Sequence, residues 1–528
     1  MTSSIYSDYP PQLTPEQQKC LVATLTDWSI AHGLAVRPSP ALVSDPLGVL
    51  ATTAPVTLFP SPFPKRCFEE ALGIQTAYNE LYSGIARDEE WLGKIVEELA
   101  EVDDFIAKLW DTHLAVKREC YAQDLSLGLF RSDYMIHIDH ATPNSNPELK
   151  QVEFNTIASS FGGLSTQVSA LHRHVKSTLQ GSHANFTRYL FHNPAYRLPP
   201  IINQHSFPQN PSISRLAAGL AAAAISYGSP KSSSLELAVL FLVQDPERNV
   251  FDQRHLEYQL ESEHGIRAYR LPFHRILTDT ALAPETRALL YHPPEAPSTA
   301  IEITIIYFRA GYAPSEYTHP DAWLARLHLE RSAAIKCPSV LTHLAGVKKV
   351  QQVLATPGSP HLSRFLRDPA VAQRVQGTFT NIYPLDESEA GLGAQKLALD
   401  PETAKGFVLK PQREGGGNNI YRTAITPYLR DKVPKERWKS YILMELINPP
   451  SLNNSILRNG KIESGSVIGE LGVFGVCLWR NPKGKDGSGE ILKNEEAGYL
   501  LRTKGRESEE GGVAAGFGSM DSVVLVDM

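Results

Sequence analysis

Cysteine is scarce in this chain, and long apolar runs are missing. Five cysteines are scattered over 528 residues, without a C-x-x-C pair or any other spacing typical of metal ligands. An odd and dispersed set is typical of reduced thiols that are buried as small apolar side chains. The longest run of small apolar residues, 216–225, is about half as long as a membrane span, and residues 1–12 lack the regions of a signal peptide. We therefore expect a cytoplasmic protein with no membrane partner.

An excess of positive charge is also missing. The formal net charge is −6, and 20% of the residues are charged against 42% hydrophobic, as in ordinary globular proteins. This balance argues against a general binder of nucleic acid or anionic membranes, so no nucleic-acid partner is expected. A chain of this length is expected to form about two or three domains.

Several catalytic signatures are absent as well. No G-x-x-x-x-G-K-[ST] sequence occurs, which excludes a Walker-type phosphate loop. Protein-kinase signatures, a nucleophile elbow and an H-E-x-x-H motif are likewise missing. Any nucleotide site in this chain therefore has to be built in another way.

Hydrophobic periodicity predicts a mixed α/β protein. Helices are expected over 14–34, 69–119 and 164–179, and 182–213 is expected to be a long surface connection. Strands alternate with helices from 235 to 308, which predicts a parallel α/β unit with ligands at the carboxyl ends of its strands. Further strands are expected at 375–383, 406–410, 440–447, 466–480 and 490–503.

The segment from Lys410 to Tyr421 is the most informative stretch. It follows a short apolar strand and combines cations, a carboxylate, consecutive glycines and carboxamides. Consecutive glycines let backbone N–H groups form an anion-binding concavity, to which Lys410 and Arg413 add positive charge. Glu414 would repel phosphate unless a divalent cation lay between them, and Mg²⁺ is commonly bound by carboxylates together with phosphate oxygens. We interpret the segment as a loop that closes over a Mg-nucleotide, with a flexible linker as the alternative.

Other residues could take part in such a site. Glu153 and Asn155 lie on one side of a predicted strand and offer hard oxygen ligands, although both could equally face solvent. Ser159 and Ser160 follow in a small-residue turn that could contact a phosphate or a carboxylate. Residues 444–447 could contact an adenine ring, although such a strand is more often plain core.

Charged residues near the end of the chain suit the same chemistry. Glu470 interrupts an apolar strand, which indicates a metal, an arginine partner or an edge position. Arg502 and Lys504 precede a second glycine-rich loop at 511–516 and suit a carboxylate and a phosphate. The pair Lys348-Lys349 is more typical of a solvated helix face. Because the Walker and protein-kinase signatures are absent, a Mg-nucleotide site in this chain favours the ATP-grasp architecture. In that architecture the nucleotide lies between two sheets under a glycine-rich lid.

The order of the motifs resembles that of eukaryotic glutathione synthetases from about Arg131 to the end of the chain. The matching segments are RSDYM (131–135), QVEFNTIASSFGGL (151–164), ERNVFDQR (247–254), YFRAGY (307–312), ERSAAIKCP (330–338), LAGVKKVQQ (344–352), KPQREGGGNNIY (410–421), ELGVFGV (470–476) and LLRTKGRESEEGGVAAG (500–516). The resemblance implies an ATP-grasp fold with an inserted parallel α/β substrate-binding domain and a glycine-rich lid. The expected division is 1–234 for the N-terminal part of the core, 235–346 for the insertion and 347–528 for the C-terminal part, with the lid at about 376–450.

The resemblance also implies an activity and roles for individual residues. Members of the family join γ-glutamylcysteine to glycine with release of ADP and phosphate, and act as homodimers with ATP and a pair of Mg²⁺ ions. Matched positions imply that Arg131, Arg502 and Lys410 are the catalytic cations and that Glu153, Asn155 and Glu414 hold the metal. The implied ATP contacts are Glu153, Lys348, Lys410, Glu414, Gly415, Gly416, Gly417, Asn418, Asn419, Tyr421, Met444, Glu445, Leu446, Ile447, Glu470, Lys504 and Glu510. The implied substrate contacts are Arg131, Ala158, Ser159, Ser160, Glu247, Arg248, Asn249, Gln253, Arg309, Ala310, Gly311, Tyr312, Arg502, Val513 and Ala514.

Some positions depart from the family pattern, and other functions remain open. Ala310 and Leu446 stand where an acidic and a basic residue are common, Glu510 replaces Asp, and 481–489 lengthens a hairpin. One alternative is the same ligase chemistry with another acceptor such as β-alanine. A second is a nucleotide-binding homologue without turnover, against which the presence of the implied metal ligands argues. A third is a kinase, which would form ADP without any amine.

Overall fold

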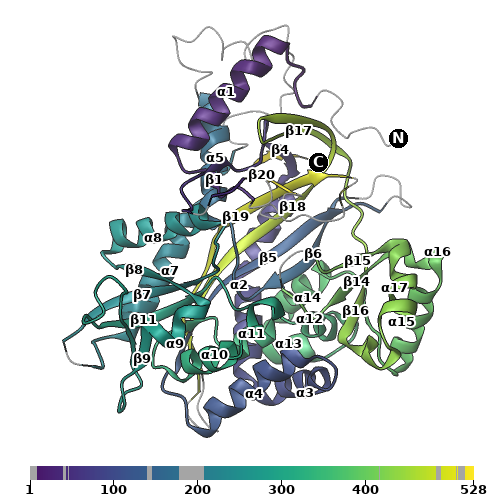
Figure 1. Cartoon of the computed structure of the whole chain (residues 1–528). Coiled ribbons are helices and arrows are strands. Elements are labelled where there is room, and N and C mark those ends of the chain that lie inside the picture. The colour runs from purple at the N-terminus through teal and green to yellow at the C-terminus, as the bar shows by residue number, and fades with distance from the viewer. Residues whose placement is uncertain are drawn as a thin grey trace.

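A mixed sheet runs through the middle of the computed structural model and carries helices on both faces (Figure 1). The structure describes residues 9–39, 43–45, 47–139, 146–177, 207–232, 234–414, 417–482, 489–506, 508 and 518–527. In these residues the sheet has thirteen strands, ten of them in the order β17-β3-β20-β19-β18-β5-β12-β11-β10-β9. The strand β6 pairs with β5, while β7 pairs with β11 and β8.

The long antiparallel strands form the part of this sheet that matters for the site. They are β5 (Leu125–His137), β6 (Glu148–Asn155), β17 (Leu452–Arg458), β18 (Lys461–Arg480), β19 (Glu490–Gly505) and β20 (Ser519–Asp521), with the short β3 (Val56–Thr57) beside them. Apolar residues on the two faces of these strands belong to two separate hydrophobic clusters. Phe130 and Phe154 face one cluster, whereas Leu129 and Val476 face the other, as the alternation of side chains along a strand requires. The sheet therefore has a core on each side.

Helices α2 (Lys65–Arg87) and α7 (Ser212–Tyr227) cover opposite faces of the strand β18. A Cβ atom at Gly475 would lie 2.1 Å from Asn79 Oδ1 of α2, and one at Gly219 of α7 would lie 2.7 Å from Val476 Cγ1. Both glycines thus allow a close approach that a side chain would block. The helix α5 (Gly162–Ser177) packs beside α7, and its predicted range of 164–179 is close to the observed one.

The predicted parallel α/β unit is present. Its strands are β7 (Glu236–Val243), β8 (Ala268–Pro272), β11 (Ile301–Phe308) and β12 (Ile335–Cys337), and β12 continues the parallel pairing to β5. The antiparallel strands β9 (Thr280–Leu282) and β10 (Leu289–Tyr291) follow at the edge. Helices α8 (Val250–His264), α9 (Ile276–Asp279), α10 (Ala322–Arg331) and α11 (Val340–Ala345) connect or cover these strands. This unit shares one sheet with the core, and the division at 235–346 stays a prediction.

A separate four-stranded antiparallel sheet, shown in green at the right of Figure 1, has the order β13-β16-β14-β15. Its strands are β13 (Ile382–Pro384), β14 (Phe407–Pro411), β15 (Ile420–Tyr421) and β16 (Tyr441–Glu445), with helices α15 (Glu389–Leu399), α16 (Pro401–Ala404) and α17 (Ile425–Lys432) against it. Helices α12 (Lys348–Ala355), α13 (His361–Phe365) and α14 (Pro369–Thr378) lead into it. The predicted strand at 375–383 is wrong for 375–381. The helix α14 extends to Thr378 after a start fixed by Pro369 and the Asp368 cap, and β13 begins only at Ile382.

The predicted helical region 69–119 is interrupted twice. Aspartates cause the interruptions, because Asp88 Oδ1 accepts a hydrogen bond from Trp91 N (3.1 Å) and Asp103 Oδ1 accepts from Phe105 N (3.1 Å). Each cap starts a new helix, α3 (Glu89–Ala100) and α4 (Asp104–Arg118). The remaining elements are α1 (Pro15–Ala31), β1 (Ala35–Val36), β2 (Thr52–Thr53), β4 (Ser61–Pro64) and β21 (Val523–Val526).

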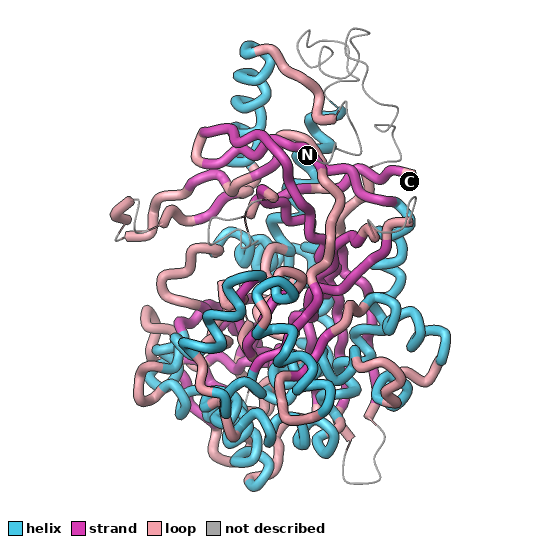
Figure 2. Tube along the Cα trace, turned by 90° about the vertical axis from the view of Figure 1, so that its right-hand side faces the viewer, coloured by secondary structure: helices cyan, strands magenta, loops and turns pink. Residues whose placement is uncertain are grey.

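Figure 2 shows strands in magenta running through the middle of the molecule, with helices in cyan beside them. Among the helices that the structure describes, none has both the length and the apolar character needed to cross a membrane. The described cysteines are all free, and Cys67, Cys337 and Cys477 are buried as expected, whereas Cys120 is exposed.

Candidate active site

Four neighbouring strands, β6, β5, β18 and β19 (Figure 1), carry the charged residues of the candidate site. Cross-strand pairing sets Arg131 of β5 opposite Asn155 of β6, and Glu470 of β18 opposite Arg502 of β19. Since residues two apart on a strand share a face, the same face also carries Glu153. Residues that lie far apart in the sequence thus form one polar surface.

Asp133 is a member of this cluster that the motif analysis did not single out. Its side chain is fully buried, and its carboxylate accepts hydrogen bonds from Arg131 Nε (2.6 Å), Asn155 Nδ2 (2.9 Å) and an Arg502 guanidinium nitrogen (2.9 Å). Arg502 also pairs with Glu470. Of the explanations considered for Glu470, the structure therefore shows an arginine partner. The sequence did carry a signal for Asp133, because a residue two positions after Arg131 on the same strand shares its face.

A second cluster joins the large sheet to the four-stranded one. Lys348 Nζ lies 3.3 Å from Glu153 Oε2 and 3.5 Å from Glu414 Oε1. Lys348 and Lys349 are only 4% and 7% exposed, so the interpretation of this pair as a solvated helix face is wrong. They lie at the buried start of α12, where Gln412 Oε1 accepts from Lys349 N (2.9 Å).

Burial and mutual charge shift the pKa values in this second cluster. Burial would raise the pKa of Glu153, but Lys348, Lys410 and Arg502 outweigh it and lower that pKa to about 2. Burial raises the pKa of Glu414 to about 7, against the opposing effect of Lys348. Burial lowers the pKa of Lys410 to about 8, although Glu153 lies near. The site therefore combines one carboxylate that stays ionised and one that readily holds a proton.

Two side-chain contacts fix the residues that precede the glycines of this segment. Lys410 Nζ donates to the Val152 carbonyl (2.8 Å). Arg413 donates to Asp103 Oδ2 (2.5 Å) and so binds the start of α4. This ion pair holds the Arg413 guanidinium, and the expectation that Arg413 adds charge to an anion concavity stays a prediction. Gly415 and Gly416 lie outside the described residues.

A cavity of about 530 Å³ lies between the large sheet and the four-stranded sheet. The predicted nucleotide residues that line it are Lys410, Asn419, Tyr421, Met444, Glu445, Leu446, Ile447, Glu470 and Lys504. The lining residues that were not predicted are Met135, Val152, Val408, Arg422, Asn448, Pro449, Ile468, Arg506 and Ser508. The alternation of side chains along a strand could have identified several of these lining residues. Val408, Ile468 and Arg506 each lie two residues from a predicted nucleotide residue and therefore share its face of the strand. The volume suits a nucleotide.

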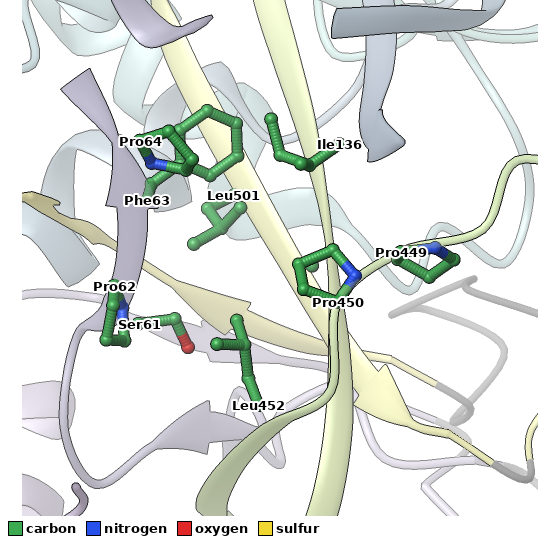
Figure 3. Close-up of a pocket in the computed structure, with 10 residues that line it drawn as sticks. Ser61, Pro62, Phe63, Pro64, Ile136, Pro449, Pro450, Leu452 and Leu501 are labelled. Carbon is green, nitrogen blue, oxygen red and sulfur yellow. The ribbon is translucent and has the colours of Figure 1, made fainter. Parts of the chain in front are cut away.

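A smaller cavity of about 20 Å³ lies near Pro449, between β4 and the β18–β19 pair (Figure 3). Phe63, Ile136, Leu452 and Leu501 are among its lining side chains, which are almost entirely apolar. It has room for about one water molecule and few polar partners for it. This cavity is a packing defect and no ligand site.

The predicted substrate residues form a second polar surface next to Arg131. Arg309 donates to the Ser159 carbonyl (3.0 Å), and Arg131 donates to the Ser160 carbonyl (3.1 Å). Ala158 and Phe161, on either side of these serines, have φ values of 52° and 76°. Residues other than glycine rarely adopt this left-handed backbone conformation, so the surrounding contacts must hold the turn in place.

The remaining predicted substrate residues lie just before α8, in its first turn and after β11. Gln253 Nε2 donates to Glu247 Oε2 (2.7 Å), and Glu247 Oε1 accepts from Asn249 N (2.9 Å). Arg248 lies between Glu247 and Asn249, just before α8. Ala310 is fully buried in the apolar core, so a ligand could reach it only through its backbone.

Glu316, which was not predicted, accepts hydrogen bonds from the backbone N–H groups of Gly311, Tyr312 and Ala313 (3.0–3.1 Å) and so fixes the turn that follows β11. Three other predicted residues, Glu510, Val513 and Ala514, lie outside the described residues.

The residues present fit a cation that is shared with phosphate. No group of three or more His, Cys, Asp or Glu side chains with metal-ligand geometry occurs in the described residues. Glu153 and Glu414 nevertheless converge on one cationic atom, Lys348 Nζ, with Asn155 nearby on β6. Two carboxylates and an amide oxygen are too few for a complete protein cage and match Mg²⁺ that is completed by phosphate oxygens.

The fold and the site define an ATP-grasp type of nucleotide-binding protein. A family model described as "Eukaryotic glutathione synthase, ATP binding domain" matches residues 15–525. The chain belongs to the eukaryotic glutathione synthetase family. It is therefore an ATP-dependent ligase that acts on small molecules and forms a peptide bond.

Individual relatives support this assignment along nearly the whole chain. The "Glutathione synthetase large chain" of Schizosaccharomyces pombe is 38% identical over 97% of this chain and 98% of its own length. The glutathione synthetase of Homo sapiens is 37% identical over 96% and 97%. A solved glutathione synthetase-like effector from Globodera pallida, in its apo form, has a TM-score of 0.69 at 20% identity and covers 98% of both chains, which shows the shared fold.

Proposed function

We propose that the protein joins γ-glutamylcysteine to glycine with ATP and so forms glutathione. The observation that carries the proposal is the convergence of a nucleotide-sized cavity and a charged cluster on the same four strands. In this reaction the γ-phosphoryl group is transferred to the cysteinyl carboxylate, and ADP leaves. The glycine amine then attacks the acyl carbon, loses a proton and displaces phosphate.

Positive side chains account for most of what the protein does in these steps. Arg131 and Arg502 are held side by side by Asp133, next to the turn of Ser159 and Ser160. They can orient the substrate carboxylate and stabilise the charge that develops on it. Lys410 lies at the wall of the nucleotide cavity, where its ammonium suits a phosphate oxygen. Positioning and electrostatics supply most of the catalysis in phosphoryl transfer, so no nucleophilic side chain is required.

We further propose that Glu153, Asn155 and Glu414 hold Mg²⁺ together with the ATP phosphates. Bound there, the cation would neutralise phosphate charge as the phosphoryl group is transferred. The glycine segment that follows Glu414 would exclude water and so protect the acyl phosphate from hydrolysis.

Coupled measurement of ADP release tests the function. With Mg²⁺, ATP and γ-glutamylcysteine, ADP should appear only when glycine is added. Parallel reactions with β-alanine decide the acceptor, and faster turnover with β-alanine would replace glycine in the proposal. ADP formation that is independent of any amine would instead indicate a kinase or an ATPase, and no amine-dependent ADP under any of these conditions would refute the ligase.

We propose a homodimer as the working assembly. An apolar stretch supports this, because Leu47 and Val49 are 84% and 70% exposed and Val43 and Leu50 are exposed beside them. Exposed apolar residues that are grouped in this way are typical of an interaction surface. Sedimentation equilibrium should return twice the mass of 58.3 kDa, and Leu47→Glu combined with Val49→Glu should weaken the association. A monomer at micromolar concentration would contradict this assembly. The cytoplasmic location stays a prediction.

A further inference from the structure

Asp133 lies at the centre of the site but cannot touch a ligand. Its side chain has no exposed surface. Oδ1 accepts from Arg131 Nε, while Oδ2 accepts from a second Arg131 nitrogen (2.8 Å), from Asn155 Nδ2 and from Arg502. All three partners are residues to which the proposed function gives a role. A buried carboxylate with this set of partners acts only through them.

The bond to Asn155 fixes the direction of that amide group. An ionised carboxylate only accepts hydrogen bonds, so the atom that Asn155 turns toward Asp133 must be the NH₂ group. The same NH₂ group also donates to the Arg131 carbonyl (3.1 Å), which uses its second hydrogen. The amide oxygen of Asn155 is therefore the atom left to face away from Asp133. Oxygen is the atom that Mg²⁺ requires from an amide.

A glycine in the intervening strand makes this arrangement possible. The strand β18 lies between β5 and β19, and its Gly472 is opposite Asp133. A Cβ atom at Gly472 would lie 2.7 Å from Arg131 Cδ and 2.8 Å from Asp133 Oδ1. Since real Cβ atoms do not approach so closely, any other residue here would displace the pair. The missing side chain lets Asp133 reach Arg502 across β18.

We propose that Asp133 is a positioning residue that sets the metal-binding atom of Asn155 and aligns Arg131 with Arg502. The inference rests on the proposed function and extends it to a residue that contacts no ligand. In this proposal Gly472 is required because a side chain at that position would collide with Arg131 and with the Asp133 carboxylate. Partners that orient a ligand to a metal typically change metal affinity about 10–100-fold when they are removed.

The variant Asp133→Asn tests the proposal, because its amide can donate to the Asn155 oxygen and so turn the Asn155 NH₂ group toward the cation. Binding of Mn²⁺ in the presence of ADP, followed by the electron paramagnetic resonance signal of free Mn²⁺, requires no turnover. We expect the apparent Kd for Mn²⁺ to rise about 10–100-fold. With the arginines no longer aligned, the KM for γ-glutamylcysteine should rise as well.

The exchange variant Asp133→Asn/Asn155→Asp separates the two tasks of Asp133. It keeps the net charge and returns a hydrogen bond between positions 133 and 155, with a carboxylate oxygen facing the cation. Mn²⁺ affinity should recover at least tenfold relative to Asp133→Asn, whereas the KM for the dipeptide should stay raised because the arginines still lack their carboxylate. Because the exchange restores the charge, it also provides the test if Asp133→Asn alone does not fold: its Kd for Mn²⁺ should then lie within about tenfold of the wild-type value, and a larger rise would overturn the proposal.

Glu302→Gln is the matched control, because Glu302 is another fully buried carboxylate, in β11, with bonds to Tyr227 Oη (2.7 Å), Lys231 N (2.7 Å) and Ser232 N (2.8 Å). It should lower the melting temperature and leave the Kd for Mn²⁺ unchanged. Unchanged Mn²⁺ affinity in folded Asp133→Asn, or no recovery in the exchange variant, would overturn the proposal. Absence of glycine-dependent ADP release by the wild-type protein would refute the proposed function alone, since the Mn²⁺ measurement does not depend on it.

Discussion

Glu414→Gln should lose turnover and gain stability at the same time. The substitution removes one carboxylate of the proposed metal site, and glycine-dependent ADP release should fall at least about 10²–10³-fold, the range found when one preorganised electrostatic group is removed from an active site. The shape of the side chain is preserved, so the loss would not come from a cavity. Saturating Mg²⁺ should not restore the rate.

The gain in stability follows from the pKa of Glu414, which burial raises from 4.5 to about 7. A raised pKa in the folded state means that the contribution of the group to stability is present in full below pH 4.5 and is lost as the pH rises through 7. The neutral glutamine avoids that loss. In the absence of metal, the variant should therefore unfold at a higher urea concentration than the wild type at pH 8, by a free energy on the order of 3 kcal/mol, and at the same concentration at pH 4.

The exposed Glu402 offers a matched control on the same four-stranded module, where it pairs with Lys405 on the surface (2.7 Å). Glu402→Gln should change neither turnover nor the pH dependence of unfolding, since surface pairs contribute little. Substantial activity in Glu414→Gln would show that the cation is held elsewhere. Loss of activity together with lower stability at pH 8 would show that Glu414 is mainly a structural partner of Lys348.

Local patterns in the sequence predicted much of the fold. The alternation of strands and helices predicted for 235–308 ends with β11 (Ile301–Phe308), because eight consecutive buried residues leave no other assignment for so short an apolar run. The alternation of side chains along a strand also placed Glu153 and Asn155 on one face. The first half of the strand predicted at 375–383 is wrong because tertiary packing overrides local preference: Val375 and Thr378 are buried in a helix despite their β-branched side chains.

Side-chain partners between distant strands could not be predicted in the same way. Period two gives the face of a residue, but it does not give the neighbouring strand or the register of pairing. Arg131, Asn155 and Arg502 meet only because β6, β5, β18 and β19 are adjacent, and Gly472 gives no sign in the sequence that it clears the way for Asp133. The burial of Lys348 depends in turn on how the four-stranded sheet sits against β6. Such contacts are set by tertiary packing.

Lys348→Met should destabilise the metal-free protein strongly. Lys348 Nζ is the cation between Glu153 and Glu414, at 3.3 Å and 3.5 Å, and these carboxylates hold its pKa above the usual value although burial opposes them. Without it, two buried carboxylates face each other. Removal of one partner from a buried ionic group typically costs about 3–5 kcal/mol. We expect a clear fall in the melting temperature in the presence of EDTA.

Mg²⁺ should repair this defect better in the variant than in the wild type. A divalent cation can supply the charge that Lys348 no longer provides, and a ligand that binds only the folded state stabilises it in proportion to its occupancy. Addition of Mg²⁺ should therefore raise the melting temperature of Lys348→Met by more than that of the wild type. Equal shifts in the two proteins would mean that the cation does not bind between Glu153 and Glu414.

Lys336→Met separates this effect from the general cost of removing a buried lysine. Lys336 is also buried, but its ammonium donates to the Ser332 carbonyl (2.8 Å), and burial lowers its pKa to about 8. Its charged form is therefore disfavoured in the folded protein, so methionine should cost little stability there. No additional response to Mg²⁺ is expected in this variant. A Mg²⁺ response in Lys336→Met as large as in Lys348→Met would place the effect outside the Glu153–Glu414 pair and would remove the main structural support for a cation at that position.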